Sequence, residues 1–251
     1  MTNAVRYAMA GLLLAAGLFA ARSEASVIIS GTRVVYPAQE KEVTVRLTNE
    51  GKVPMLVQSW LDNGDADANP DSIKVPFTLT PPIFRMDAGK GQAVRLMYTQ
   101  EPLPTDKESL FWLNVLEVPP KAANPEGRNL LQFAFRTRIK LFFRPSGLQG
   151  NSQEAPNKLV WKLINDKDGK GLALEASNPT PYYVNFSSVG LKVGDHSYSQ
   201  QGALGGMVAP GGSSTFLIKE LTTRPAGGAR ADFSTINDYG AITKADAALT
   251  L

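Results

Sequence analysis

The chain has 251 residues, of which 43% are hydrophobic and 20% are charged, so it can bury one large core or two ordinary ones and is not disordered throughout. Its 26 Lys and Arg residues against 23 Asp and Glu residues give a net charge of +3, too small for a nucleic-acid binder that neutralises phosphates. The absence of cysteine excludes disulfides and thiolate chemistry, and a single histidine argues against most metal sites. We therefore expect no cofactor, no metal and no nucleic-acid partner.

The first 25 residues have the pattern of a secretory signal peptide. Arg6 precedes an apolar run over 8–21, and the run is followed by a small-x-small site at 23–25, Ser-Glu-Ala. The run is shorter than the ~20 apolar residues that a bilayer requires. The alternative is a retained N-terminal anchor. We expect residues 1–25 to be removed as a signal peptide and the rest of the chain to be exported.

From residue 26 onward the chain shows short alternating or β-branched runs separated by Gly, Pro, Asn and Asp, with almost no helical period. In the first half these runs predict strands over 27–29, 43–47, 55–61, 75–79, 93–98 and 110–118. The run over 110–118 is apolar on both parities, as a strand buried on two faces is. Many short strands at this spacing favour an all-β fold built from β-sandwiches.

The longest strand signal runs over 130–143. Its bulky apolar side chains share one parity: Leu131, Phe133 and Phe135. Fourteen extended residues would span about 45 Å, well beyond the usual strand of about 5–6 residues. Two consecutive strands separated by a bend are the alternative. A long edge of this kind is an aggregation hazard, so a secreted protein either covers it or pairs it with another chain.

Arg144-Pro145 ends this run, because proline cannot donate to a strand ladder. Residues 146–158 form a polar stretch rich in Gly, Asn and Pro. A second β-rich series follows, with strands predicted over 159–164, 172–177, 182–193, 214–218 and 231–236. We therefore expect a first domain over 26–145, a hinge over 146–158 and a second domain over 159–251.

No motif in the sequence supports enzymatic chemistry. Residues 65–69 start like a calcium loop, but Pro70 stands where that loop needs glycine. His196 lies in a predicted loop and no nucleophile elbow accompanies it. Asn185 begins a match to the N-glycosylation pattern, which is common by chance. Paired carboxylates for glycoside chemistry pair in space and leave no signal in the sequence. We expect a protein that is not an enzyme.

Two cations stand near the ends of predicted strands. Arg33 follows the run over 27–29, and Lys140 lies on the opposite parity of the long run from Phe133. An Arg and a Lys that converge on one point make a good carboxylate receptor, through forked hydrogen bonds and a point charge. The sequence does not show that they converge, and the alternative for each is a solvated surface cation.

Seven segments of the chain carry a family resemblance: 31–37 (GTRVVYP), 58–60 (QSW), 80–85 (TPPIFR), 108–114 (ESLFWLN), 138–145 (RIKLFFRP), 178–183 (NPTPYY) and 236–240 (INDYG). In order and spacing they resemble the periplasmic pilus-assembly chaperones of the chaperone–usher pathway, the PapD-like family. The resemblance extends from about residue 26 to the C-terminus. It implies two immunoglobulin-like β-sandwich domains in an L or boomerang arrangement.

In that family a pilus subunit is a sandwich without its last strand, and the chaperone lends it a long edge strand. By motif position, the resemblance implies that Leu131, Phe133 and Phe135 are the lent side chains. It also implies that Arg33 and Lys140 grip the C-terminal carboxylate of the subunit. A slip by one residue would present the wrong side chains to the subunit, so this anchor sets the register.

The resemblance further assigns Glu108, Arg144 and Asp238 to a structural salt-bridge network between the domains. It implies a periplasmic protein that delivers fimbrial subunits to an outer-membrane usher without consuming nucleotide. Whether the free protein covers its own edge by self-association is left open by the sequence. The segment over 120–130 is short, and no cysteine precedes the first domain, as in the short-loop subfamily. The second domain has no disulfide, unlike some family members, so its stability depends on packing.

Two other classes of protein are compatible with a secreted β-sandwich. A pilus or adhesin subunit would have one immunoglobulin-like domain, a polymerising extension and usually a cysteine pair. A secreted β-sandwich hydrolase would need a nucleophile motif and a base. Two predicted domains, the Arg33 and Lys140 anchors and a single histidine argue against both classes.

Overall fold

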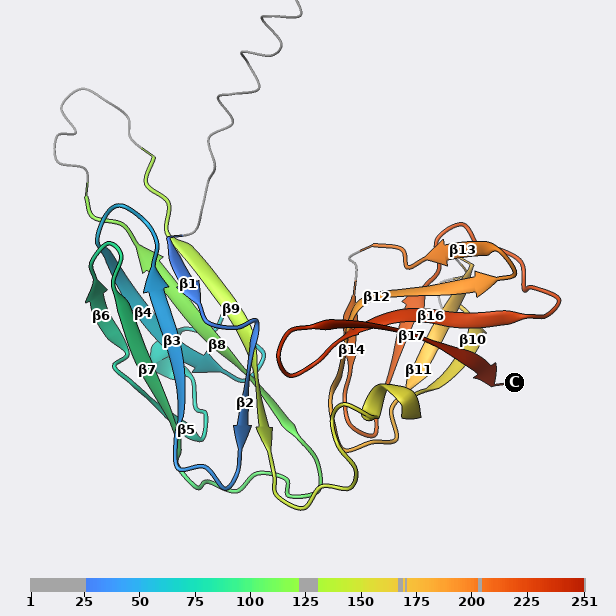
Figure 1. The fold of residues 1–251 in the computed structure, drawn as a ribbon, viewed down its shortest axis with the longest axis horizontal. Coiled ribbons are helices and arrows are strands. Elements are labelled where there is room, and N and C mark those ends of the chain that lie inside the picture. Colours follow the sequence, from blue (N-terminus) through green and yellow to red (C-terminus); the bar gives the residue numbers. More distant parts are fainter. Residues whose placement is uncertain (1–25, 122–130, 167–168, 170, 203–204, 251) are drawn as a thin grey trace, which may run out of the picture.

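The computed structural model describes residues 26–121, 131–166, 169, 171–202 and 205–250. The predicted signal peptide, residues 1–25, and Leu130 lie outside the described residues. Two β-sandwiches are set at an angle to each other, like the arms of an L (Figure 1). Among the residues that the structure describes, no helix is long and apolar enough to cross a membrane. The predicted all-β fold with two sandwich domains is confirmed.

The first sandwich consists of two sheets. One contains, in order, β1 (Val27–Ile29), β3 (Val43–Asn49), β7 (Gly91–Tyr98) and β5 (Phe77–Thr80). The other contains, in order, β2 (Arg33–Pro37), β9 (Phe135–Arg144), β8 (Ser109–Val118), β4 (Met55–Asp62) and β6 (Ile83–Met86). The short 3-10 helix η1 (Pro70–Ser72) lies between β4 and β5.

The second sandwich is a continuous sheet that folds around its own core. Its strands are, in order, β13 (His196–Ser199), β12 (Val184–Val193), β16 (Ala229–Ile236), β17 (Ile242–Thr250), β10 (Val160–Asn165), β11 (Leu172–Ser177) and β15 (Ser213–Leu217). A further strand, β14 (Gly206–Val208), pairs with β12. β17 closes the sandwich, because it pairs antiparallel with β16 and parallel with β10. The 3-10 helix η2 (Ala155–Lys158) precedes β10.

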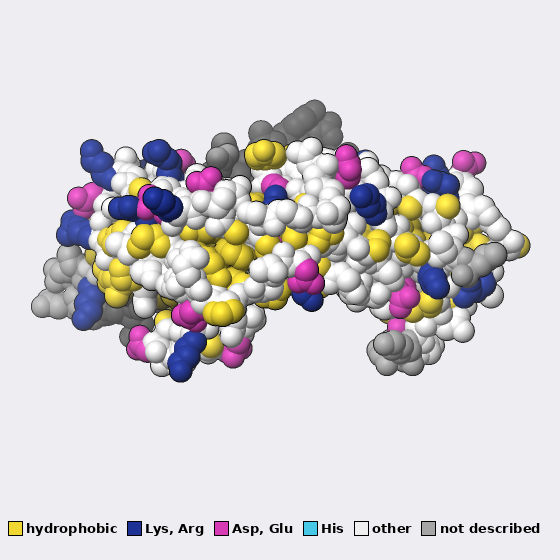
Figure 2. Space-filling view, turned by 90° about the horizontal axis from the view of Figure 1, so that it is seen from below, with side chains coloured by type: hydrophobic (Ala, Val, Ile, Leu, Met, Phe, Trp, Pro, Cys, Tyr) yellow, Lys and Arg dark blue, Asp and Glu magenta, His cyan; other side chains and the backbone are white. Residues whose placement is uncertain are grey.

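Each domain has an aromatic core of its own. In the first, Phe77 lies 5.5 Å from Tyr36 and 5.0 Å from Phe111, measured between ring centroids. In the second, the fully buried Trp161 lies 4.8 Å from Phe233. Burial of such side chains contributes roughly 1.5–3 kcal/mol each, so packing can replace the missing disulfide. Figure 2 shows hydrophobic side chains also gathered on the surface of the first domain towards the second, with charged side chains mostly around them.

Most predicted strands are present, with ends that differ by no more than two residues from the prediction. The prediction of one strand over 130–143 is wrong at its start, because β9 begins at Phe135. The ladder between β8 and β9 ends at the Glu117–Phe135 pair, and Pro119-Pro120 cannot extend it. Leu131 and Phe133 therefore precede the strand. The sequence also missed β2, β6, β13, β14 and β17, and His196, predicted in a loop, begins β13.

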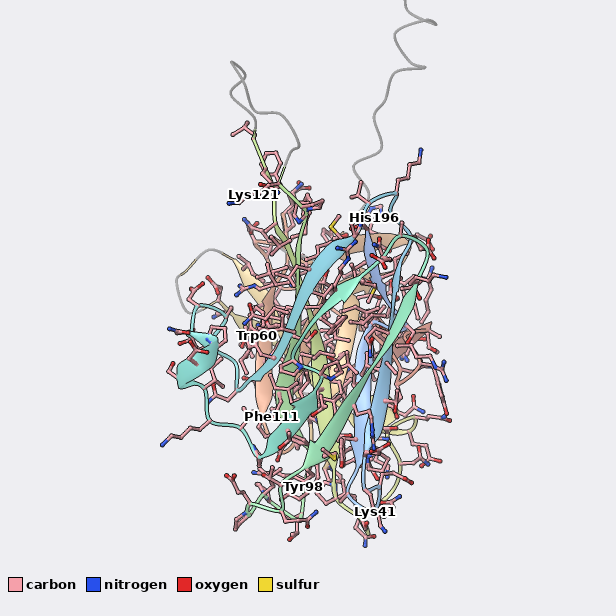
Figure 3. All side chains as sticks on the ribbon, turned by 90° about the vertical axis from the view of Figure 1, so that its left-hand side faces the viewer. Lys41, Trp60, Tyr98, Phe111, Lys121 and His196 are labelled. Atoms are coloured by element: carbon pink, nitrogen blue, oxygen red, sulfur yellow. The ribbon has the colours of Figure 1, made fainter. Side chains whose placement is uncertain are left out.

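β9 runs along the whole length of the first sandwich. It starts at the end that carries Lys121 and runs towards the opposite end, where Lys41 and Tyr98 lie (Figure 3). The chain then crosses to the second domain (Figure 1). The residues between β9 and β10 include η2, and the proposed hinge over 146–158 stays a prediction. One end of β9 is thus distant from the domain junction and the other end lies at it.

Candidate functional site: an open strand edge and a pair of cations

Arg33 is the first residue of β2. The sequence had indicated only that it follows the strand over 27–29, and had not predicted β2. β1 pairs with β3 in one sheet, and the chain then turns through residues 30–32 and enters the other sheet as β2. Gly31 has a φ of +140°, which favours glycine, and its N–H donates to the carbonyl of Ile29 at 2.8 Å. This change of sheet places β2 beside β9, parallel to it.

The structure brings Arg33 and Lys140 together. They are directly opposite each other in the parallel β2–β9 ladder, so their side chains lie on the same face of the sheet. Nη1 of Arg33 donates to the carbonyl of Ile236 at 3.1 Å, and Nζ of Lys140 donates to Oδ1 of Asn185 at 2.5 Å. Both acceptors belong to the second domain. The two cations therefore lie at the junction of the domains.

Among the ion pairs of the described residues, none includes Arg33 or Lys140. Burial, together with the charge of Arg33, lowers the pKa of Lys140 to about 8. Burial also lowers the pKa of Arg33, although Asp238 partly offsets this effect. Nε of Arg33 is buried and has no hydrogen-bond partner among the described residues. A buried donor without an acceptor beside a second cation is a site that can receive an anionic group such as a carboxylate.

The outer edge of β9 is open over its first half, and the open part ends at the pair of cations. β2 pairs only with residues 140–144 of β9, so among the described residues no strand lies beside the outer edge of β9 from Phe135 to Ile139. Leu131, Phe133 and Phe135 are exposed by 85%, 63% and 46%. In the alternation of side chains along the chain, they fall on the same side as Ile139 and Leu141, which face the core. They lie beyond the end of that core. The edge can accept a further strand, and its apolar side chains have no core of their own.

The third predicted group forms a network that joins the domains. Nε of Arg144 donates to Glu108 at 2.7 Å, and its Nη1 and Nη2 donate to the two carboxylate oxygens of Asp238 at 2.8 and 3.0 Å. Oγ of Ser152 donates to Asp238 at 2.8 Å, and the backbone N–H of Tyr183 donates to Glu108 at 2.7 Å. The arginine at the end of β9 thus links the segment before β8 with the β16–β17 hairpin.

Burial and pairing act in opposite directions in this network. Burial raises the pKa of Glu108, and the attraction of Arg144 does not fully offset it. Burial also acts to raise the pKa of Asp238, but the hydrogen bonds and charge of Arg144 outweigh burial and lower it. The pKa of Arg144 is raised, because its two carboxylate partners outweigh the effect of burial. Each charge depends on the others for compensation.

A cavity of about 290 Å³ lies between the domains beside both groups. It is lined by side chains of the network and by Phe142, Asn185 and Ile236, and the Phe142 and Tyr183 rings lie 5.5 Å apart across the junction. The residues that accept hydrogen bonds from Arg33 and Lys140 thus line this cavity, whereas the two cations themselves do not.

Several residues around the two cations escaped the sequence interpretation. The guanidinium of Arg138 lies 4.1 Å from the centre of the Trp112 ring, and Lys140 Nζ lies 5.7 Å from it. Arg138 is in turn paired with the buried Asp62. Burial acts to raise the pKa of Asp62, but its hydrogen bonds with Arg138 and Asn114 lower it. The sequence placed Asn185 only in a glycosylation pattern, and an acceptor supplied by the Ile236 backbone leaves no sequence signal.

Comparison with known proteins agrees with this geometry. Residues 26–149 match the family model described as "Pili and flagellar-assembly chaperone, PapD N-terminal domain", and residues 154–247 match "Pili assembly chaperone PapD, C-terminal domain". The probable fimbrial chaperone YadV of Escherichia coli (strain K12) is 49% identical over 234 residues, which cover 92% of this chain and 93% of YadV.

Solved structures show the same likeness. The crystal structure of the YadV chaperone superimposes with a TM-score of 0.75 at 46% identity and covers 89% of this chain and 99% of YadV. A chain in the structure of the Salmonella enterica SafA pilin in complex with the SafB chaperone gives a TM-score of 0.72 at 28% identity, covering 91% of this chain and 99% of that chain. Both domains, in order, match one family, and the chain therefore belongs to the PapD-like pilus-assembly chaperones, which are not enzymes.

Proposed function

We propose that this protein captures pilus subunits in the periplasm by pairing the open edge of β9 with an incomplete subunit. Arg33 and Lys140 grip the C-terminal carboxylate of the subunit, and an outer-membrane usher then receives the complex. The observation that carries the proposal is that the open edge of β9 ends at this pair of cations.

The position of β2 fixes where the added strand ends. Because β2 occupies the edge of β9 from Lys140 onward, a strand added beside residues 131–139 must stop at Arg33. A strand that runs parallel to β9 has its C-terminus there, so its terminal carboxylate meets both cations. Backbone hydrogen bonds supply affinity along the edge, and the two charge-assisted bonds fix the end point.

The anchor determines which side chains at the start of β9 and just before it enter the subunit. With the carboxylate at Lys140, the residues that point into the open groove of the subunit are Leu131, Phe133 and Phe135. A shift of one residue would present Gln132 and Ala134 in their place and lose the apolar burial. The network of Glu108, Arg144 and Asp238 has a structural role, because it holds the second-domain acceptors against the anchor.

Several findings support the partners in this proposal. The relatives are named as fimbrial chaperones, and one structural neighbour is a complex of a pilin with its chaperone. The predicted signal peptide and the family support a periplasmic location, and the family supports the usher. Because an open apolar edge promotes association, we expect the free protein to cover β9 by self-association.

Co-expression with a fimbrial subunit from the same operon tests the proposal. We expect Arg33→Ala and Lys140→Ala each to abolish recovery of soluble chaperone–subunit complex, while circular dichroism shows that each chaperone variant is folded. Arg85→Ala and Lys162→Ala remove exposed cations from β6, at the opposite edge of the sheet from β2, and from β10 of the second domain, and serve as matched controls that retain full recovery. Normal subunit recovery with both anchor variants would overturn the carboxylate anchor.

A further inference from the structure

Glu117, on β8, is a buried carboxylate that the proposed function does not use. It is 3% exposed, and none of the ion pairs among the described residues includes it. Its Oε2 accepts hydrogen bonds from the backbone N–H of Ser26 at 3.1 Å, from the backbone N–H of Val27 at 3.0 Å, and from the hydroxyl of Ser26. Three donors from the start of the first domain thus converge on one oxygen.

These donors are neutral as long as Ser26 is joined to the residue before it. Burial of an ionised carboxylate is unfavourable unless a positive charge compensates it, and hydrogen bonds from neutral groups do so only in part. A positive charge at the backbone nitrogen of Ser26 would provide that compensation at the observed distance of 3.1 Å. The chain has such a charge at this atom only when Ser26 is its first residue.

The position of Ser26 is tightly defined by its neighbours. Its carbonyl accepts from the backbone N–H of Glu50 at 2.7 Å. A Cβ atom added at Gly51 would lie 2.6 Å from the Ser26 Cβ, so glycine leaves the space that Ser26 occupies. Ser26 is also the residue that directly follows the small-x-small site over 23–25. The cleavage pattern in the sequence and the carboxylate in the structure therefore indicate the same residue.

We propose that Glu117 is the receptor for the new N-terminus of the exported chain. A signal peptidase hydrolyses the bond between Ala25 and Ser26: the amide C–N bond breaks, water supplies the hydroxyl to Ala25 and a hydrogen to the Ser26 nitrogen, and transfer of the acid proton leaves a carboxylate and an α-ammonium. The α-ammonium of Ser26 then forms a buried ion pair with Glu117. Cleavage precedes folding, because Ser26 is buried in the folded domain.

The location of this ion pair connects it with the open edge. Glu117 is the partner of Phe135 in the β8–β9 ladder, and β1 begins beside the start of β9 (Figure 1). A residue retained before Ser26 would turn the α-ammonium into an amide and leave Glu117 without a counter-charge. Removal of the signal peptide thus completes the first domain at the end where β9 starts. This inference does not depend on the carboxylate anchor and has a separate readout.

The experiment exports the full chain to the bacterial periplasm and compares two N-termini. The first is the natural chain, and the second has Gly-Ser inserted between Ala25 and Ser26, so that cleavage leaves Ser26 with an amide. Each form is made with Glu117 and with Glu117→Gln, which keeps an acceptor but removes the charge. Intact mass gives the N-terminus, and urea unfolding gives the stability of the four proteins. Glu50→Gln, which removes an exposed carboxylate beside Ser26, is the matched control.

We expect the mature natural chain to start at Ser26. Glu117→Gln should increase the equilibrium constant of unfolding in both chains, and the increase in the natural chain should be at least about tenfold larger than that in the inserted chain. Glu50→Gln should show no such difference. If the Glu117→Gln chain does not fold, the inserted chain with Glu117 must still be less stable than the natural chain. A mature N-terminus at another residue, or equal effects of Glu117→Gln in both backgrounds, would overturn the proposal.

Discussion

The ammonium of Lys140, in the first domain, donates a 2.5 Å hydrogen bond to the carboxamide oxygen of Asn185, in the second. Asn185 is buried on β12, and the carbonyl of Ile236 on β16 holds Arg33 in the same way. Neutral oxygens of the second domain thus accept one hydrogen bond from each cation in the free protein. In the proposed complex a subunit carboxylate competes with these oxygens, and as an anion it is the stronger acceptor.

The first prediction concerns Asn185. Asn185→Asp places a carboxylate on Lys140, and the internal ion pair competes with the subunit. We expect subunit capture to fall about tenfold or more, because charge-assisted hydrogen bonds contribute about 1.5–3 kcal/mol. Asn185→Ala removes the neutral acceptor and should leave capture nearly unchanged. Quantitative co-purification of subunit measures both. Asn157→Asp, which adds a charge to the same cavity, is the control, and an equal loss in that variant would contradict this mechanism.

The second prediction is a dependence of subunit capture on pH. The pKa of Lys140 is about 8 in the free protein, so this side chain loses its charge as the pH rises through 8. A carboxylate stabilises the ammonium, so the affinity should be highest below pH 8 and fall by up to about tenfold per pH unit above it. Binding isotherms between pH 7 and pH 9.5 measure this change. Lys140→Met should bind the subunit weakly, with an affinity that does not change over this pH range. If the affinity of this variant still fell with pH, the pH dependence would belong to another group.

The same pKa has the opposite effect on the stability of the free protein. The pKa of Lys140 is lower in the folded chain than its ordinary value of 10.5, so the unfolded chain binds more protons between pH 8 and 10.5. The contribution of Lys140 to the free energy of unfolding therefore increases as the pH rises through this range. Comparison of urea unfolding of the wild type and Lys140→Met across this range isolates that contribution.

The third prediction compares side chains on the two faces of the segment that leads into β9. Phe133→Ser removes an exposed apolar side chain, so the melting temperature of the free protein should change little. Subunit capture should fall about tenfold or more, because a buried Phe contributes roughly 1.5–3 kcal/mol. Ala134→Ser changes the neighbouring exposed residue on the other parity and should leave capture intact. Equal losses in both variants would show that alternation along the edge does not determine binding.

The fourth prediction concerns the network between the domains. Arg144→Ala leaves the buried carboxylate of Glu108 and the partly buried carboxylate of Asp238 without their cation, and we expect a loss of about 3 kcal/mol in the free energy of unfolding at neutral pH. Arg95→Ala breaks the exposed ion pair with Glu42 and should cause a much smaller loss. Urea titrations measure both. If the two losses were equal, the network would not contribute as a buried group.

Much of the chain could be interpreted from its residues because strand signals are local. Alternating and β-branched runs with Gly, Pro, Asn and Asp between them indicated nearly every long strand of both sandwiches. The exception, β17, carries Ala245, Ala247 and Ala248, which lack the branched or aromatic side chains typical of strands, and it is held by pairing with β10 and β16. Motifs gave the family and the candidate residues, but not their neighbours.

Tertiary structure decided which charges meet. Arg33 and Ile236 are 203 residues apart, and Lys140 and Asn185 are 45 apart, so their contacts depend on sheet register and on the angle between the domains. The start of β9 likewise depends on where its partner β8 ends, and the role of Glu117 depends on the position of Ser26. Composition and periodicity determine which face of a strand is apolar. Contacts between distant segments form only when whole sheets pack, so the sequence alone could not show them.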